Sequence, residues 1–138
     1  KLNYKNLYIM DIYFGGNKKV FADVNGFTVK TDQGERSGGD GEYPEPFTLF
    51  LASLGTCAGI FVKFFCDQRG LPTDKIKLTQ DQEYDPAKKM IGKININIHI
   101  PEDFPEKYEQ PLIQTAGLCS VKRHVREDID ISVKTVRG

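Results

Sequence analysis

The chain has 138 residues, a length that suits one domain and hardly suffices for two. Its 39% hydrophobic and 28% charged residues indicate a packed core under a well-solvated surface, which excludes a disordered chain. Nineteen lysines and arginines balance nineteen aspartates and glutamates, so net charge gives no reason to expect nucleic acid or a membrane as a partner. We therefore interpret residues 1–138 as a single domain that binds neither.

The cysteines and the N-terminal segment favour a cytoplasmic protein. Three cysteines are an odd number, whereas a secreted disulfide-rich domain usually carries more of them, in even number. The N-terminal segment KLNYKNLYIMDIYF lacks the small-residue cleavage site that follows the apolar run of a signal peptide. Because the sequence contains no CxxC and no closely spaced ligand pair, we expect neither a thioredoxin-type motif nor a metal site.

The first third of the chain predicts three strands and a loop. Residues 7–14, 20–25 and 27–31 are rich in β-branched and aromatic side chains and are separated by glycine-containing turns. The next segment, 34–46, holds four glycines and two prolines without apolar periodicity, which is typical of a loop.

A long helix is predicted over residues 47–69, with Pro46 in its first turn and Gly70 as its stop signal. Its side chains are apolar on nearly all sides, which indicates a helix buried in a core or in a membrane. The uninterrupted apolar run is shorter than the ~20 residues that a bilayer requires, and Lys63 lies within it, so we predict a core helix. A small monomer would not cover every side of this helix, which favours a dimer or a sheet that wraps around it.

The second half predicts a hairpin, two helical segments and a final strand. Strands are expected over 76–84 and 90–100, and isoleucines at every second position of the latter place one face on the core. A helix over 106–118, a short basic helical segment over 121–126 and a strand over 129–136 follow. The expected buried stripe of the first of these helices comprises Tyr108, Leu112, Ile113 and Ala116. The order βββ–α–ββ–α–β predicts an α+β fold, with antiparallel β-sheets packed on a long central helix.

The cysteines are the main candidates for chemistry. Cys57 lies inside the long helix between Gly55 and Gly59, which indicates either close packing or the approach of a ligand to the sulfur. The alternative is a thiol that serves as a small buried hydrophobe. Cys66 follows nine residues later and faces the opposite side of the helix, so it is expected to be structural.

Cys119 comes directly before a basic helical segment. A helix N-terminus and the nearby Lys122, Arg123 and His124 are expected to lower the pKa of its thiol. The alternative is a cysteine that only fills a helix junction.

The segment SGGDGEYPEPFTLFLASLGTCAG, residues 37–59, resembles the signature of the OsmC/Ohr superfamily. In both, a glycine-rich loop ends in a proline, and a helical cysteine follows eleven residues after that proline, here Pro46 and Cys57. Cys119 matches the second family cysteine, which comes roughly sixty residues later, before a short basic segment. The similarity extends from about Gly15 to the end of the chain and agrees with the predicted order of elements.

The resemblance implies an intertwined homodimer that reduces organic hydroperoxides in the oxidative stress response. In this interpretation the chain is a peroxidase-type oxidoreductase that needs no cofactor. Cys57 would attack the peroxide, Cys119 would resolve the product as a disulfide, and a thiol or dithiol reductant would restore both.

The sequence departs from the well-studied peroxidases, which activate the thiolate with a glutamate after the loop proline and an arginine near the N-terminal strands. Phe47 occupies the glutamate position here, and in this respect the chain resembles the divergent OsmC-like redox branch. Substitute candidates for activation are Lys18, Arg36, Glu45 and Arg123. The departure leaves two alternatives: a non-catalytic dimer that binds a small apolar molecule near Cys57, and a dithiol–disulfide exchange protein.

Overall fold

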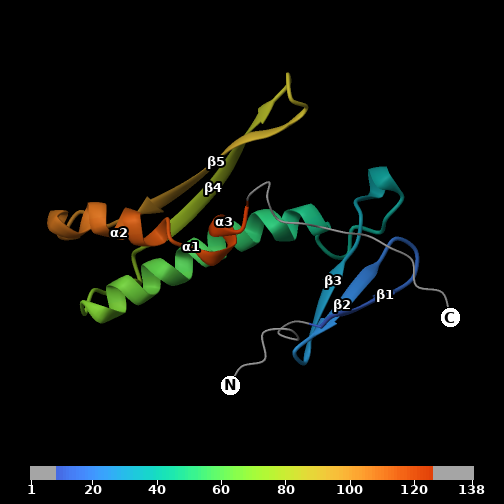
Figure 1. Ribbon diagram of the computed structural model, residues 1–138, viewed down its shortest axis with the longest axis horizontal. Helices are drawn as coiled ribbons and strands as arrows, with labels where there is room; N and C mark the ends of the chain where they lie inside the picture. The colour runs from blue at the N-terminus through green and yellow to red at the C-terminus, as the bar shows by residue number, and fades with distance from the viewer. Residues whose placement is uncertain (1–8, 126–138) are drawn as a thin grey trace. The chain divides into compact units, whose positions relative to one another are not determined.

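The computed structural model of the chain describes residues 9–125 (Figure 1). Its elements are, in order, β1 (Asp11–Phe14), β2 (Val20–Val24), β3 (Phe27–Thr31), η2 (Glu35–Ser37), α1 (Pro46–Gln68), β4 (Lys77–Asp85), β5 (Met90–His99), η3 (Glu106–Tyr108), α2 (Glu109–Ala116) and α3 (Ser120–Arg123). This order confirms the predicted α+β fold with antiparallel sheets, whereas the strand predicted over 129–136 lies outside the described residues. Two compact units, Lys1–Ala52 and Ser53–Gly138, divide the chain at a point within α1.

The first unit contains an antiparallel meander in the order β1-β2-β3. Strands β2 and β3 are joined by the two-residue turn Asn25-Gly26, and both residues have positive φ, of 51° and 80°. Such a turn matches the twist of paired strands, and glycine adopts its geometry without steric cost. The ring of Phe21 on β2 makes edge contacts with Tyr13 and Tyr43, at 5.8 Å between centroids in both cases, and these contacts attach the following loop to the sheet.

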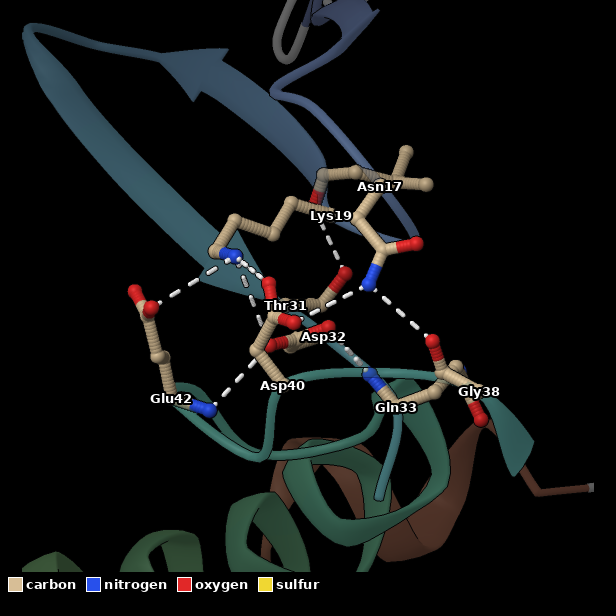
Figure 2. Close-up of polar contacts among 9 residues, drawn as sticks. Asn17, Lys19, Thr31, Asp32, Gln33, Gly38, Asp40 and Glu42 are labelled. Atoms are coloured by element: carbon tan, nitrogen blue, oxygen red, sulfur yellow. Dashed lines mark hydrogen bonds and ion pairs between the residues drawn. The ribbon is translucent and has the colours of Figure 1, made fainter. Parts of the chain in front are cut away.

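A cluster of charged side chains, which we call the loop clamp, holds the glycine-rich loop that precedes α1 (Figure 2). The clamp comprises Lys19, Asp32, Asp40 and Glu42. The ammonium group of Lys19 forms an ion pair with Asp40 and lies 3.8 Å from Asp32 and 3.7 Å from Glu42. The fully buried carboxylate of Asp32 accepts peptide N–H groups of Gln33 at 2.8 Å and Glu42 at 3.1 Å. A buried carboxylate is tolerated only with such partners. Because Gln33 comes directly before the loop and Glu42 lies in its second half, these contacts hold the loop at two separate places.

Helix α1 begins and ends close to the predicted residues. Pro46 is its first residue, a position where the missing N–H removes no helical hydrogen bond. After Gln68 the chain reverses at Gly70, which has φ of 65°, and the N–H groups of Gly70 and Leu71 donate to the carbonyls of Asp67 and Cys66. These two bonds close the C-terminus of the helix in the Schellman pattern.

The core of the second unit lies where one face of α1 meets α2 and the β4–β5 hairpin, as Figure 1 shows. Its buried members are Ala58, Val62, Phe65, Cys66, Phe104, Leu112 and Ala116. Ile96, Ile98 and Ile100 pack against this cluster, whereas the amide of Asn95, on the opposite face of β5, donates to Asp81 at 2.7 Å. The two-faced character predicted for this strand is therefore confirmed.

The segment in which a helix was predicted, residues 106–118, is helical, but one residue of its predicted buried stripe is exposed. The chain forms the turn η3 and then α2, in which Leu112 is 2% exposed and Ala116 is also buried. Ile113 was expected in the buried stripe, but it is 53% exposed. Tyr108, Leu112 and Ala116 follow one another at the four-residue spacing of a helix face, and Ile113 is turned about 100° away from that face.

The face of α1 opposite the core exposes large apolar side chains in the second unit. Ile60 is 43% exposed and Phe64 is 55% exposed. By length and composition alone α1 would suffice to cross a membrane, a test that core helices of soluble proteins also pass. Its packing against α2 and the hairpin agrees with the predicted core helix, and residues 9–125 leave one apolar side of it exposed.

Candidate functional site

Cys57 lies near the middle of α1, and its sulfur contacts the first turn of α3. The peptide groups of Val121 and Ser120 and the thiol of Cys119 lie close enough to this sulfur to lower its pKa. Tertiary packing therefore brings together the two cysteines that the sequence selected. All three cysteines of the chain are free thiols in this structure.

The surroundings of Cys57 favour its ionised form. The hydrogen bond from the Val121 N–H is the largest effect and lowers the pKa of the thiol. Partial burial acts in the opposite direction, but the Cys119 thiol and the Ser120 N–H add to the lowering, so the pKa stays below its ordinary value. Cys57 is thus the sulfur that more readily becomes a nucleophile.

The pKa of the Cys119 thiol is raised, contrary to the prediction from its place before a basic helix. Cys119 is 2% exposed, and this burial is the main reason why its pKa is raised. Its contact with Cys57 raises the pKa further, and the N–H of Lys122, which donates to Cys119 Sγ at 3.3 Å, compensates only in part. The prediction was wrong because burial of this sulfur and its contact with Cys57 outweigh the N–H groups of the α3 turn.

Cys66 takes no part in this pair. It is 0% exposed and packs among the core residues of α1 and α2. Burial, followed by the nearby charge of Asp67, raises the pKa of its thiol. A protonated and enclosed thiol of this kind is unreactive, in agreement with the structural role predicted from its position on the helix.

The other residues predicted to activate the thiolate lie at several places. Lys18, Arg36 and Glu45 belong to the first unit, where the Glu45 carboxylate accepts the N–H of Gly34 at 3.2 Å. Arg123 ends α3, and its peptide N–H donates to the carbonyl of the residue that caps this helix. Roles for these four side chains in activation stay predictions.

Sequence reasoning missed the contribution of Ser120 and Val121. Both act through the peptide N–H, which every residue except proline carries, so their side chains give no signal in the sequence. The start of a helix directly after Cys119 was the one available indication, because the first N–H groups of a helix have no partner within it. In the described part of the chain, no group of three His, Cys, Asp or Glu side chains is suited to hold a metal ion.

Comparison with known protein families decides which family this is. The model of the family described as OsmC-like protein matches residues 39–134, a span that includes most of the loop, all of α1, Cys57 and Cys119. The chain belongs to the OsmC-like protein family. A comparison with curated proteins gave no significant match.

Solved structures confirm the fold of this OsmC-like chain. A Psychrobacter arcticus protein with a proposed role in osmotic stress and detoxification has 16% identity and a TM-score of 0.74, over 92% of this chain and 94% of that one. The organic hydroperoxide resistance protein OsmC from Legionella pneumophila has 17% identity and a TM-score of 0.59, over 94% and 95%. An OsmC-like protein from Mycoplasma pneumoniae has 13% identity and a TM-score of 0.66, over 84% of each chain. At these identities the likeness shows the fold alone.

Proposed function

We propose that this OsmC-like protein is a thiol-dependent organic hydroperoxide reductase, in which Cys57 attacks the peroxide and Cys119 resolves the product. The observation that carries the proposal is the proximity of the two thiols, whose surroundings move their pKa values in opposite directions. Cys57 is thereby the sulfur that ionises more readily and attacks, and Cys119 stays beside it as a protonated thiol.

The reaction balances with the groups present at this site. The Cys57 thiolate attacks the terminal oxygen of a hydroperoxide, and the O–O bond breaks to give Cys57 sulfenic acid and an alkoxide, which takes a proton from water. Cys119 then forms an S–S bond with the sulfenic sulfur, and its proton leaves with the hydroxyl group as water. An external thiol or dithiol reduces the disulfide and returns both cysteines to the starting state.

Relatives support this activity at the level of the family. Two solved structures of this fold, from Legionella pneumophila and Bacillus subtilis, are named organic hydroperoxide resistance proteins. In this chain Phe47 follows the loop proline, and the lowering of the Cys57 pKa comes from peptide N–H groups and the second thiol. These groups supply activation that does not depend on a carboxylate at position 47.

We further propose that the protein acts as a cytoplasmic homodimer. The described residues leave the apolar side of α1 that carries Ile60 and Phe64 exposed, and a second copy with the same surface would bury both side chains. Phe64→Glu is expected to weaken the dimer about 10- to 100-fold, since burial of a phenylalanine contributes about 1.5–3 kcal/mol. Sedimentation measures the association, with Lys88→Glu on the hairpin turn as the control. A wild-type chain that sediments as a monomer at high concentration contradicts the dimer.

Stopped-flow oxidation by cumene hydroperoxide and by hydrogen peroxide tests the catalytic proposal. The wild type and Cys66→Ala are expected to consume the organic peroxide, and Cys57→Ser is expected to be inactive. Cys119→Ser should react once and stall as a sulfenic acid that dimedone traps. Consumption that survives Cys57→Ser, or its absence from the wild type, refutes the proposal. Reduction of insulin disulfides without peroxide consumption would instead indicate dithiol–disulfide exchange.

A further inference from the structure

We propose that Gln80 is a positioning residue for the reactive pair: its side chain occupies the gap that Gly55 leaves in α1 and fixes the position of this helix along the β4–β5 hairpin. Cys57 follows Gly55 by two residues on α1, and Cys119 lies between α2 and α3. The inference rests on the proposed function, in which the two thiols must meet to form a disulfide. All of these residues belong to the second compact unit of the chain.

The side chain of Gln80 approaches α1 closely at Gly55. A Cβ atom built at position 55 would overlap the amide oxygen Oε1 of Gln80 and lie 3.6 Å from its Cδ. Every residue except glycine carries a Cβ atom, so only glycine lets the carboxamide come this near to the helix backbone. The sequence left open whether the glycines beside Cys57 serve close packing or the approach of a ligand. For Gly55, the contact with Gln80 favours close packing.

Gln80 reaches the helix from the core-facing side of the hairpin. In the antiparallel register Gln80 is paired with Ile96, and Leu78 is paired with Ile98. Residues paired in this way point to the same side of a sheet, and Leu78, Ile96 and Ile98 all pack against the core cluster. The half-buried amide of Gln80 therefore occupies a position whose neighbours are apolar. Moving an amide out of water into such a place is unfavourable, so apolar burial does not explain a glutamine here.

The contact adds a directional element to packing that is otherwise apolar. Val62 of α1 lies in the core cluster against which Ile96 and Ile98 of the hairpin pack. Apolar burial is non-directional, so it determines how closely α1 lies on the hairpin more than how far along the hairpin it lies. A side chain seated in a gap of the helix opposes a shift of α1 along its own axis.

A shift of α1 along the hairpin would move Cys57 relative to Cys119. Leu112 and Ala116 of α2 belong to the core cluster on which the hairpin packs, and Cys119 comes three residues after the end of α2. A disulfide needs Cα atoms about 4.4–6.8 Å apart and a defined dihedral angle, and a misplacement of about 1 Å slows a reaction between positioned groups strongly. Gln80 is therefore expected to act on the second chemical step, in which Cys119 forms the S–S bond and the sulfenic hydroxyl leaves as water.

Two substitutions, each with a matched control, isolate the contact. Gly55→Ala fills the gap, and Gln80→Ala removes the side chain that occupies it. Gly59→Ala is the control for the first, because position 59 is also two residues from Cys57 and a Cβ built there meets no other part of the described chain within 4 Å. Gln82→Ala is the control for the second, because Gln82 comes next on the same side of β4 and is exposed. The double variant Gly55→Ala/Gln80→Ala completes the comparison.

The main measurement is the equilibrium of the Cys57–Cys119 disulfide with reduced and oxidised glutathione, which gives the effective concentration of one thiol at the other. This quantity reports the alignment of the two thiols and requires no peroxide. Trypsin places each cysteine on its own peptide, residues 37–63, 64–69 and 108–122, so mass spectrometry identifies the linked pair. Iodoacetamide labelling of Cys66 reports unfolding, because this thiol is fully buried in the native protein. The rates of Cys57 oxidation and of disulfide formation after one equivalent of cumene hydroperoxide are measured separately.

Gly55→Ala and Gln80→Ala are each expected to lower the effective concentration and to slow disulfide formation about three- to tenfold. The double variant should lose no more than either single variant, because all three remove the same contact. Oxidation of Cys57 itself should stay within about twofold of the wild type in every variant, and so should all values for Gly59→Ala and Gln82→Ala.

Equal values for Gly55→Ala and Gly59→Ala, or losses that add in the double variant, overturn the inference. A wild type that forms the disulfide with glutathione but consumes no peroxide refutes the proposed function, while the comparison of effective concentrations still decides the role of Gln80. A wild type that forms no Cys57–Cys119 disulfide refutes both.

Discussion

The thiol of Cys119 lies beside the sulfur of Cys57, although roughly sixty residues separate the two cysteines. This contact lowers the pKa of Cys57 and raises that of Cys119, because it stabilises charge on the first sulfur and a proton on the second. Packing thereby shifts the pKa values of two chemically identical side chains in opposite directions. The proposed order, with Cys57 reacting first, follows from these opposite shifts in pKa.

The three thiols are expected to react with iodoacetamide in a fixed order. The lowered pKa of Cys57 means that its labelling rises through a pH range below the ordinary thiol value of about 8.5, whereas Cys119 follows only above that range. Cys66 should stay unlabelled until the protein unfolds, since it is fully buried. Mass spectrometry of the three tryptic peptides measures each rate. Faster labelling of Cys119 than of Cys57 at neutral pH would contradict the assignment.

Ser120→Pro is expected to raise the pKa of Cys57 without disturbing the fold. Proline removes the N–H that Ser120 donates to the sulfur, and it suits the first position of a helix. Cys119 already has the extended backbone that a residue before proline prefers, with ψ of 139°. The shift should be smaller than that of Cys119→Ala, because Ser120 is the weakest of the three donors.

The control for this substitution is Ser120→Ala, which keeps the N–H and should leave the labelling profile of Cys57 unchanged. Equal profiles for the proline and alanine variants would show that this peptide group has no part in stabilising the thiolate.

Leu112→Ala should destabilise the protein far more than Ile113→Ala. Leu112 is enclosed between α2 and α1, so its truncation leaves a cavity and is expected to lower the free energy of unfolding by about 2–5 kcal/mol. Ile113 lies on the exposed side of α2, and its truncation should cost no more than about 0.5 kcal/mol in a monomer. Urea unfolding followed by circular dichroism compares the two. A large cost at Ile113 would mean that another surface covers this side chain.

Asp32→Asn is expected to destabilise the protein and to reduce its sensitivity to acid. Burial raises the pKa of this carboxyl, but the N–H groups of Gln33 and Glu42 and the charge of Lys19 outweigh burial and leave the pKa below its ordinary value. A group with a lowered pKa stabilises the fold above its unfolded-state pKa of about 4, and this contribution is lost as the pH falls through the folded-state value.

Urea midpoints between about pH 3 and pH 7 measure this effect. The wild type should lose stability on acidification, and Asp32→Asn should be less stable at neutral pH and change less with pH. Asp103→Asn in an exposed turn is the control. Parallel pH curves for the wild type and Asp32→Asn would show that the buried carboxylate does not act through the loop clamp.

Sequence patterns that span only a few neighbouring residues predicted most of the described helices and strands. The Asn25-Gly26 turn, the alternating isoleucines of β5 and the proline and glycine at the ends of α1 each restrict the backbone locally, so they are visible in the sequence. The buried side of α2 was predicted less well. Ile113 and Leu112 are equally apolar, and only the position of α1 selects which of them is enclosed.

The sequence by itself determined the α+β order of elements, the family and the choice of Cys57 and Cys119, because these depend on local patterns and on residue spacing. Only the tertiary structure decided how the two thiols differ. The pKa of a sulfur depends on its burial and on the hydrogen-bond donors around it, and the donors here are the peptide groups of Val121 and Ser120 together with the partner thiol. Peptide groups are the same in every residue but proline, so only the packing of α3 against α1 determines that they stabilise the thiolate of Cys57.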